Sequence, residues 1–200
     1  SNIPIHGLIV ILPFPALRTV VIQQAYGILA QQQNGYEVAV TNFGGAIVAI
    51  MVPDKDGKVA NVIQGFDSID SLINTSEVYR STLIGRWGNR INDGKFQLNG
   101  KEYQLALNDG KNHLHGGPTG LHRQVWEAYQ TGDQNITLNV ILPYGHEGFS
   151  GEVKITVEYT WTDDNELMIE YFATTNKKTI INLTHHAFFS LQGIATPTPD

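Results

Sequence analysis

The sequence predicts an all-β protein made of antiparallel strands, and three observations support this. Apolar residues recur at every second position in several runs, as they do along strands with one buried face. Turn signals rich in Asn, Asp and Gly separate these runs. No long stretch repeats with the 3.6-residue period of an amphipathic helix. These patterns favour an antiparallel β sandwich or barrel over a parallel sheet with crossover helices.

Length, composition and charge limit the possible functions. With 200 residues, of which 42% are hydrophobic, the chain suits one β domain with a sizeable core. The formal net charge is -6 and there is no basic run, which disfavours nucleic acid and anionic membranes as partners and fits a neutral ligand better. Because the chain has no cysteine, it has no disulfides, no thiolate nucleophile and no cysteine ligand for zinc.

The first 25 residues differ from the rest. Residues 3–17 are apolar but contain three prolines, so this run is too short and too broken to span a bilayer. It also lacks the basic lead of a secretion signal, and we expect a cytoplasmic protein unless such a signal has been cleaved. We assign residues 1–25 to an N-terminal apolar segment or arm, and residues 26–200 to a single β-sandwich domain.

The first strands of this domain are marked by alternation and turns. The Asn-Gly pair at 34–35 is a strong hairpin signal, and residues 36–40 alternate after it. Residues 46–52 form the near-continuous apolar run of a buried strand. Residues 61–66 predict another short strand, whereas residues 67–74 fit either a helical turn or a loop.

The later strands alternate more clearly. Residues 96–105 predict a hairpin around an Asn-Gly turn. Residues 136–142 and 153–161 each place their apolar side chains on one face, and residues 167–173 do the same after a turn.

Two adjacent histidines lie in the apolar run 180–191, which predicts a last strand. Because successive side chains of a strand point to opposite faces, His185 and His186 cannot both face the core. We expect one ring to be covered and the other to face a cleft or solvent. A histidine titrates near neutral pH and can act as a general acid or base. The simpler interpretation of such a pair is packing or surface exposure.

Two polar, glycine-bearing segments interrupt the strands earlier in the chain. The first carries Arg86 and Arg90, whose guanidinium groups offer planar forks of donors to hydroxyl or carboxylate oxygens. The simpler alternative is that these arginines pair with acidic side chains. The second carries His113 and His115, which share a face if the segment is extended. Such a pair can ligate a metal, but no carboxylate follows closely, and hydrogen-bonding imidazoles are the better interpretation.

A series of short motifs runs from Tyr26 to Leu191. They are Asn42-Phe43-Gly44-Gly45, Val52-Pro53-Asp54, Gly65-Phe66-Asp67, Gly85-Arg86 with Asn89-Arg90-Ile91, Leu114-His115-Gly116-Gly117, Gly148-Phe149-Ser150-Gly151, and Asn182-Leu183-Thr184 with His186. Their order and spacing resemble the aldose 1-epimerase (galactose mutarotase) family. The resemblance implies an all-β, antiparallel β supersandwich of the galactose mutarotase type, incomplete in this chain.

The resemblance also implies a function. Members interconvert the α and β anomers of a free aldose, such as galactose or glucose, by acid/base opening of the sugar ring, and they use no cofactor and no metal. His186 matches the family's general acid. His115 and Arg90 match residues that bind the sugar, and Asn89 is the neighbour of that arginine. His185 stands where the family usually has Asn, a departure that bears on substrate preference.

The resemblance leaves one essential group unmatched. The family's general base is a Glu beyond the His186 strand, and no residue of this chain matches it; Glu147 is the nearest substitute. We therefore expect the chain alone to be a poor catalyst, and we expect the open edge of its last strand to favour self-association. Two other interpretations stay open: a non-catalytic sugar-binding module on the same fold, and a metal-dependent sandwich enzyme that uses His113, His115 and His185.

Overall fold

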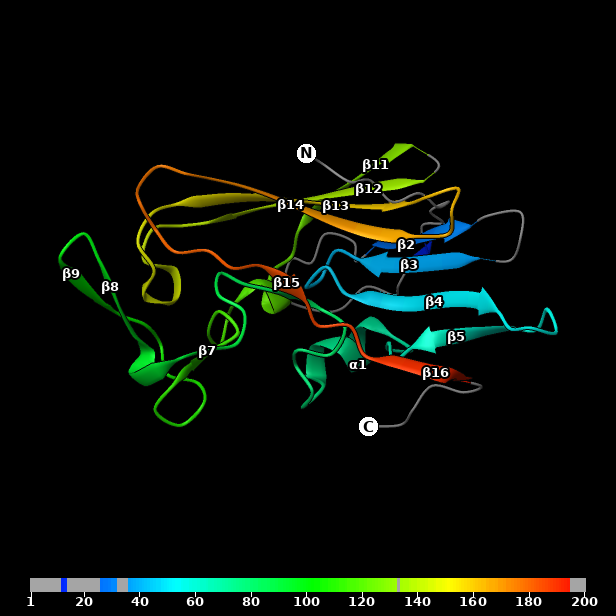
Figure 1. Ribbon diagram of the computed structural model, residues 1–200, viewed down its shortest axis with the longest axis horizontal. Coiled ribbons are helices and arrows are strands. Elements are labelled where there is room, and N and C mark those ends of the chain that lie inside the picture. Colours follow the sequence, from blue (N-terminus) through cyan, green and yellow to red (C-terminus); the bar gives the residue numbers. More distant parts are fainter. Residues whose placement is uncertain (1–11, 14–25, 32–35, 133, 195–200) are drawn as a thin grey trace.

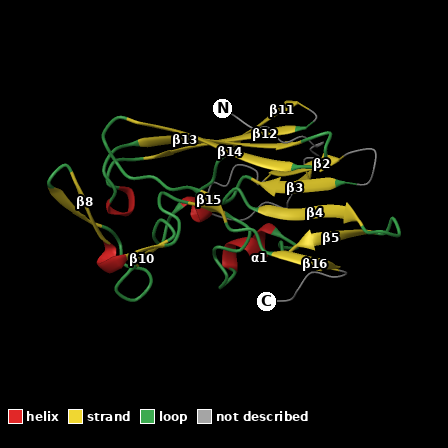
Figure 2. Ribbon diagram, viewed as in Figure 1, coloured by secondary structure: helices red, strands yellow, loops and turns green. Residues whose placement is uncertain are grey.

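The computed structural model describes residues 12–13, 26–31, 36–132 and 134–194, and these residues form antiparallel sheets (Figure 1). The larger sheet has six strands in the order β1 (Leu12–Pro13), β2 (Tyr26–Gln31), β3 (Glu37–Thr41), β4 (Ile47–Pro53), β5 (Val59–Ile63) and β16 (Phe189–Ile194). The second sheet has four, in the order β11 (Glu127–Gly132), β12 (Asn135–Leu142), β13 (Val153–Trp161) and β14 (Leu167–Thr175). Figure 2 shows how little helix accompanies these strands, and the predicted all-β fold class is confirmed.

Three short strand pairs complete the described sheets. The predicted hairpin is confirmed as β8 (Lys95–Leu98) and β9 (Lys101–Gln104), with Asn99 and Gly100 both at positive φ, as a type I′ turn requires. The other two pairs join segments that are distant in sequence: β6 (Leu83–Ile84) with β15 (Thr184–His185), and β7 (Arg90–Ile91) with β10 (His113–Leu114). Single 3₁₀ turns occur at η1 (Asn92–Gly94), η2 (Leu121–Arg123) and η3 (His146–Gly148).

The two large sheets share one apolar core. It includes side chains from both sheets, among them Val40, Ile47, Ile50, Leu138, Ile155, Val157 and Tyr159. Alternate residues of β12 and β13 face this core, as their period of two predicts. Each fully buried aliphatic or aromatic side chain stabilises the fold by roughly 1.5–3 kcal/mol relative to exposure.

The segment 67–74 is helical rather than a loop. Helix α1 (Ile69–Asn74) starts after Ser68, whose hydroxyl accepts a hydrogen bond from the Ser71 N–H at 3.1 Å, as an N-cap does. Ile69 and Leu72 are its buried side chains, and they form a second, smaller apolar cluster with Phe43 and Ala46.

Two predicted strands differ from the structure. The strand expected at 61–66 is β5, which starts earlier and ends at Ile63, because the chain then turns through Gly65 against Val48. A continuous strand over 180–191 is wrong, since β15 and β16 are separate. Between them, the His186 N–H donates to Thr82 O at 2.9 Å and the Ser81 N–H donates to His186 O at 3.0 Å. Residue 186 thus continues the pairing of β15 with the segment of β6, whereas the Gln64 N–H donates to Phe188 O at 2.8 Å and β16 then pairs with β5, so the two parts of the run have different partners.

The predicted N-terminal arm and first turn fall largely outside the described residues. Within them, β1 pairs with β2, and β2 pairs with β3 on either side of the Asn-Gly pair at 34–35, which itself is not among the described residues. In the part of the chain that the structure covers, no helix has the length and apolar character needed to cross a membrane.

Candidate functional site

Three segments that are distant in sequence meet beyond one end of the larger sheet, near β7 and β15 in Figure 1: residues 79–90, 108–122 and 182–188. Backbone hydrogen bonds tighten the contact. The Asn182 N–H donates to Arg86 O at 2.8 Å, and the Gly88 N–H donates to Asn182 O at 2.8 Å. The polar clusters that stand out in the sequence are therefore neighbours in the fold.

Glycine is required where these segments touch. A Cβ atom on Gly116 would lie 1.7 Å from the Gly85 carbonyl oxygen, and the φ of Gly116 is 88°, where side chains are strained. A Cβ atom on Gly85 would lie 2.5 Å from the Leu183 side chain. The close approach brings the loop of His115 against the loop of Arg90.

At the centre of the site, the imidazole rings of His115 and His186 face each other with centroids 5.0 Å apart and planes nearly perpendicular. His115 has a φ of 52° and so turns away from the direction of β10. The backbone N–H of Asn89 donates to the ring atom His115 Nδ1 at 2.9 Å, and the backbone N–H of His115 donates to Asn89 O at 3.1 Å. Since Nδ1 accepts, the neutral ring carries its proton on Nε2.

The surroundings keep His115 neutral. Burial, and then the nearby His186 and Arg90, lower the pKa of His115 to about 4, while Asp109 opposes them. At neutral pH the ring is therefore an uncharged imidazole whose Nε2–H can donate a hydrogen bond.

Arg90 lies at the exposed side of this histidine pair. Its Nε donates to Asp109 Oδ2 at 2.7 Å, and its Nη1 donates to Asn89 Oδ1 at 3.4 Å. Asn89 Oδ1 also accepts from the Arg90 backbone N–H at 2.9 Å. Because 54% of the Arg90 side-chain surface stays exposed, the pair adds little stability, but it orients the guanidinium.

The ring of Tyr79 packs against the histidine rings of the site, a role that the sequence did not predict. Its ring centroid lies 4.8 Å from that of His115, 4.6 Å from that of His122 and 6.3 Å from that of His186. Asn108 Nδ2 donates to the Tyr79 hydroxyl at 3.1 Å. Burial raises the pKa of Tyr79. No sequence signal marks this residue, because its role depends on contacts between distant segments.

The metal-ligating set considered from the sequence is not formed. His113 is fully buried; its Nδ1 lies 2.7 Å from Ala106 O and its ring packs against Phe149. His185 packs against Tyr159, away from His115. The expectation that His113 and His115 share a face is wrong, since the positive φ of His115 breaks the extended chain. No group of three His, Asp or Glu side chains within the described ranges is arranged to hold a metal ion.

Arg86 has a structural setting that differs from that of Arg90. It is 1% exposed, and its Nη1 donates to Ser150 O at 2.8 Å and Gly151 O at 2.9 Å. Its Nη2 donates to Pro143 O at 3.2 Å, and burial lowers its pKa to about 10. Arg86 therefore binds backbone carbonyls instead of the acidic partner that the simpler alternative expected.

Glu147, the nearest substitute for a base, is engaged with a loop. Its Oε1 accepts from the Thr119 N–H at 2.7 Å and from the Thr119 hydroxyl at 2.5 Å. Asp109 is likewise paired with Arg90. Both carboxylates thus already bind protein partners.

Comparisons with known proteins agree with this architecture. The family model described as aldose 1-epimerase matches residues 27–198. The chain is 36% identical over 166 residues to galactose mutarotase of Bos taurus, covering 83% of this chain and 48% of the relative. It is 31% identical over 171 residues to aldose 1-epimerase of Escherichia coli (strain K12), covering 85% and 49%. A solved aldose epimerase homologue from C. elegans superposes with a TM-score of 0.77 at 33% identity, covering 81% of this chain and 50% of that one. The chain spans about half the length of the curated relatives it matches.

Proposed function

Because the chain belongs to the aldose 1-epimerase family, we propose that it acts in the interconversion of the α and β anomers of a free aldose such as galactose or glucose. In this reaction a base removes the proton of the anomeric hydroxyl while an acid protonates the ring oxygen. The C1–O5 bond breaks, the aldehyde end rotates, and the ring recloses from the other face. The chemistry needs one acid and one base on opposite sides of this bond.

We assign the acid to His186. Its ring stands against His115 and Phe188, with centroid distances of 5.0 and 5.1 Å, so aromatic contacts fix its orientation. Its backbone is tied on both sides, to Thr82 and to Ser81. A fixed imidazole beside a sugar-holding group is the arrangement that protonation of a ring oxygen requires.

We assign sugar binding to Arg90, His115 and Asn89. The neutral His115 presents its Nε2–H to a hydroxyl or ring oxygen, because Asn89 occupies Nδ1. Arg90 is oriented through Nε by Asp109, and its fork of donors suits sugar hydroxyls. Asn89 links the two residues, since its backbone contacts His115 and its side chain contacts Arg90.

We propose that the general base is not among residues 1–200. No residue of this chain matches the family's base, and Asp109 and Glu147 are each already hydrogen-bonded to protein groups. The chain alone should therefore bind an aldose but exchange its anomers little faster than buffer does.

The observation that carries this proposal is the hydrogen bond from Asn89 to His115 Nδ1, which supports a neutral Nε2–H donor beside His186. The test is calorimetric titration of residues 1–200 with galactose and glucose, and polarimetry of the same samples. Arg90→Ala and His115→Ala should each weaken binding by about 1–3 kcal/mol. Lys101→Ala, on the exposed β8–β9 hairpin, should leave it unchanged.

Three results would count against the assignment. Unchanged affinity in both variants would place the sugar elsewhere. Full turnover by residues 1–200 would show that the chain contains its own base, and Glu147→Gln would then identify or exclude that carboxylate. Sugar binding without turnover in a longer form that combines residues 1–200 with the part of the family fold they do not match would favour the non-catalytic binding module.

A further inference from the structure

The turn that carries His115 has an unusual backbone conformation. The Gly117 N–H donates to Leu114 O at 3.0 Å, which closes a four-residue turn. His115 and Gly116 are its central residues, with φ values of 52° and 88°, and positive φ at both positions is typical of a type I′ turn. Asn and Gly suit these positions, whereas a histidine in this left-handed conformation is disfavoured by roughly tenfold when nothing constrains it. Contacts from outside the turn must therefore stabilise this conformation of His115.

The side chain of Asn108 supplies such contacts. Its Oδ1 accepts from the Leu114 N–H at 2.7 Å, and its Nδ2 donates to Leu114 O at 2.9 Å. Because the His115 N–H bonds to Asn89 on the side of β7, the N–H and C=O of Leu114 point to the opposite edge of β10. The amide of Asn108 pairs with both groups there, as a neighbouring strand would. It therefore fixes the first residue of the turn.

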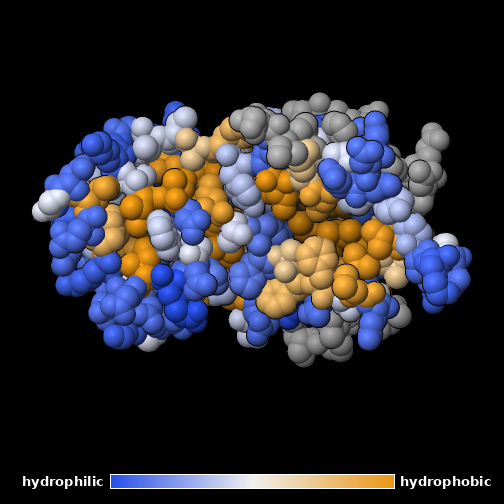
Figure 3. All heavy atoms as spheres, in the orientation of Figure 1, coloured by the Kyte–Doolittle hydropathy of each residue, from blue (hydrophilic) through white to orange (hydrophobic). Residues whose placement is uncertain are grey.

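A third hydrogen bond fixes the Asn108 amide itself. Its Nδ2 also donates to the Tyr79 hydroxyl at 3.1 Å. The donor group and the acceptor of this half-buried side chain are thus both bonded within the protein. Figure 3 shows hydrophilic residues gathered over β7 and β10 on this face of the molecule, so water competes for hydrogen bonds here. Bonds to two separate segments, at residues 79 and 114, keep the amide in place.

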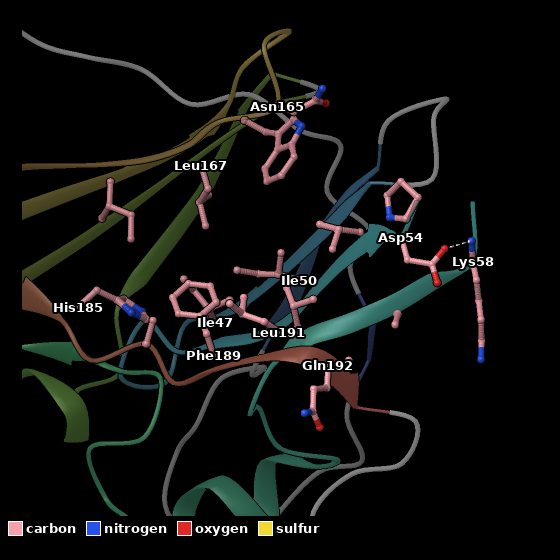
Figure 4. Close-up of a pocket in the computed structure, with 18 residues that line it drawn as sticks. Ile47, Ile50, Asp54, Lys58, Asn165, Leu167, His185, Phe189, Leu191 and Gln192 are labelled. Carbon is pink, nitrogen blue, oxygen red and sulfur yellow. Dashed lines mark hydrogen bonds between the residues drawn. The ribbon is translucent and has the colours of Figure 1, made fainter. Parts of the chain in front are cut away.

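The conformation of residue 115 decides which ring it meets. In an extended conformation it would share a face with His113, whose ring is buried against Phe149. In the turn, the ring of His115 faces that of His186 instead. Figure 4 shows the neighbouring His185 at the apolar cavity between the two large sheets, so His185 and His186 point to different sides. The turn therefore brings His115 to the proposed acid.

We propose that Asn108 is a positioning residue of the aldose site. It acts through Leu114, holds His115 in the left-handed conformation, and so keeps the Nε2–H of His115 beside His186. Asn108 itself does not touch the sugar. The proposal rests on the proposed function for the identity of its ligand, whereas the effect of Asn108 on the two histidine rings can be measured without sugar.

The first test measures the histidine rings of residues 1–200 by NMR without sugar. Asn108→Leu has a similar size and no charge, but it removes all three hydrogen bonds. Asn108→Ala, which admits water, replaces it if the larger side chain unfolds the chain. In either variant, nuclear Overhauser contacts between the rings of His115 and His186 should weaken, and the pKa of His115 should rise from about 4 toward 6.5. Asn135→Leu removes a half-buried amide that donates a hydrogen bond within the four-stranded sheet, so it should leave both measurements unchanged.

The second test is calorimetric titration with galactose. Asn108→Leu should weaken binding roughly tenfold, because it releases a histidine from a conformation that is disfavoured by that factor. Asn135→Leu should leave the affinity unchanged. In a chain that already carries His115→Ala, Asn108→Leu should weaken binding by less than about twofold, because a residue that acts through His115 then has nothing to position.

Three outcomes would overturn the proposal. In the first, the ring contacts and the pKa of His115 stay unchanged in a folded Asn108 variant. In the second, Asn135→Leu changes them as much as Asn108→Leu does, which would indicate a general loosening of the fold. In the third, Asn108→Leu lowers galactose affinity by the same factor with and without His115→Ala. If the natural chain does not bind galactose, the proposed function fails, while the ring measurements still decide the role of Asn108.

Discussion

His185 should make this fold sensitive to acid. Burial lowers its pKa from 6.5 to about 4, with a smaller effect from His186. Because the folded-state pKa is the lower one, the unfolded chain takes up the proton first as the pH falls. The stabilisation is therefore complete above about pH 6.5 and is lost as the pH falls toward 4. One pKa unit corresponds to about 1.4 kcal/mol, so the free energy of unfolding should fall by about 2 kcal/mol between pH 7.5 and pH 5 because of His185.

The perturbation is His185→Phe, which keeps a flat aromatic ring at this position without a titrating group. Urea unfolding at pH 7.5 and at pH 5 gives the free energy of unfolding of each protein. The advantage of the variant over the natural chain should grow by about 2 kcal/mol at the lower pH. The pKa values of His115 and His122 are also lowered, to about 4 and about 3, but their contributions cancel in this comparison.

A control separates the effect of the charge from the effect of altered packing. Leu191→Ala changes the apolar cavity between the two large sheets that His185 also lines, but it removes no titrating group, so it should keep the natural pH dependence. An advantage of His185→Phe that is equal at both pH values would refute the reasoning, because it would show that His185 takes up its proton without resistance in the folded chain.

Three further predictions follow from the site. Arg86→Met should lower the free energy of unfolding, measured in urea, by roughly 3 kcal/mol or more, because it leaves the carbonyls of residues 143, 150 and 151 without this donor. A loss below about 1 kcal/mol would contradict a stabilising role for these buried hydrogen bonds. Tyr79→Phe should cost about 1 kcal/mol of stability, because it loses the hydrogen bond from Asn108, and should leave galactose affinity nearly unchanged. Tyr79→Leu should lower that affinity, because the rings of His115 and His186 lose their aromatic contact. Equal affinities for the two variants would argue against this packing role. Dialysis against EDTA should not change galactose binding by residues 1–200, and a loss restored by added divalent metal would revive a metal site.

Local sequence signals predicted most of the strands. The Asn-Gly turn at 99–100 and the alternation in β12, β13 and β14 depend on neighbours within a few residues, and they match the structure. The helix at α1 could not be decided from the sequence, because six residues with one cap carry a weak signal and burial of Leu72 completes it.

Long-range contacts explain what the sequence could not provide. The break between β15 and β16 arises because the first pairs with β6 and the second with β5, a change of partner that no local pattern encodes. The positive φ of His115 separates it from His113, and non-glycine residues seldom adopt that conformation. Tyr79 contacts three histidines that lie 36 or more positions further along the chain, so its position behind them appears only once the chain is folded.

The central claim is that Arg90, His115 and His186 form one aldose-binding site, and NMR of the histidine rings during a galactose titration tests it most directly. The account predicts that the signals of His115 and His186 shift together and saturate at one common galactose concentration, and that Arg90→Ala moves this saturation to higher concentration. The ring of His113, which is buried against Phe149, should not follow the same curve. Signals of His115 and His186 that stay unchanged at saturating sugar, or that respond with different apparent affinities, would contradict the account.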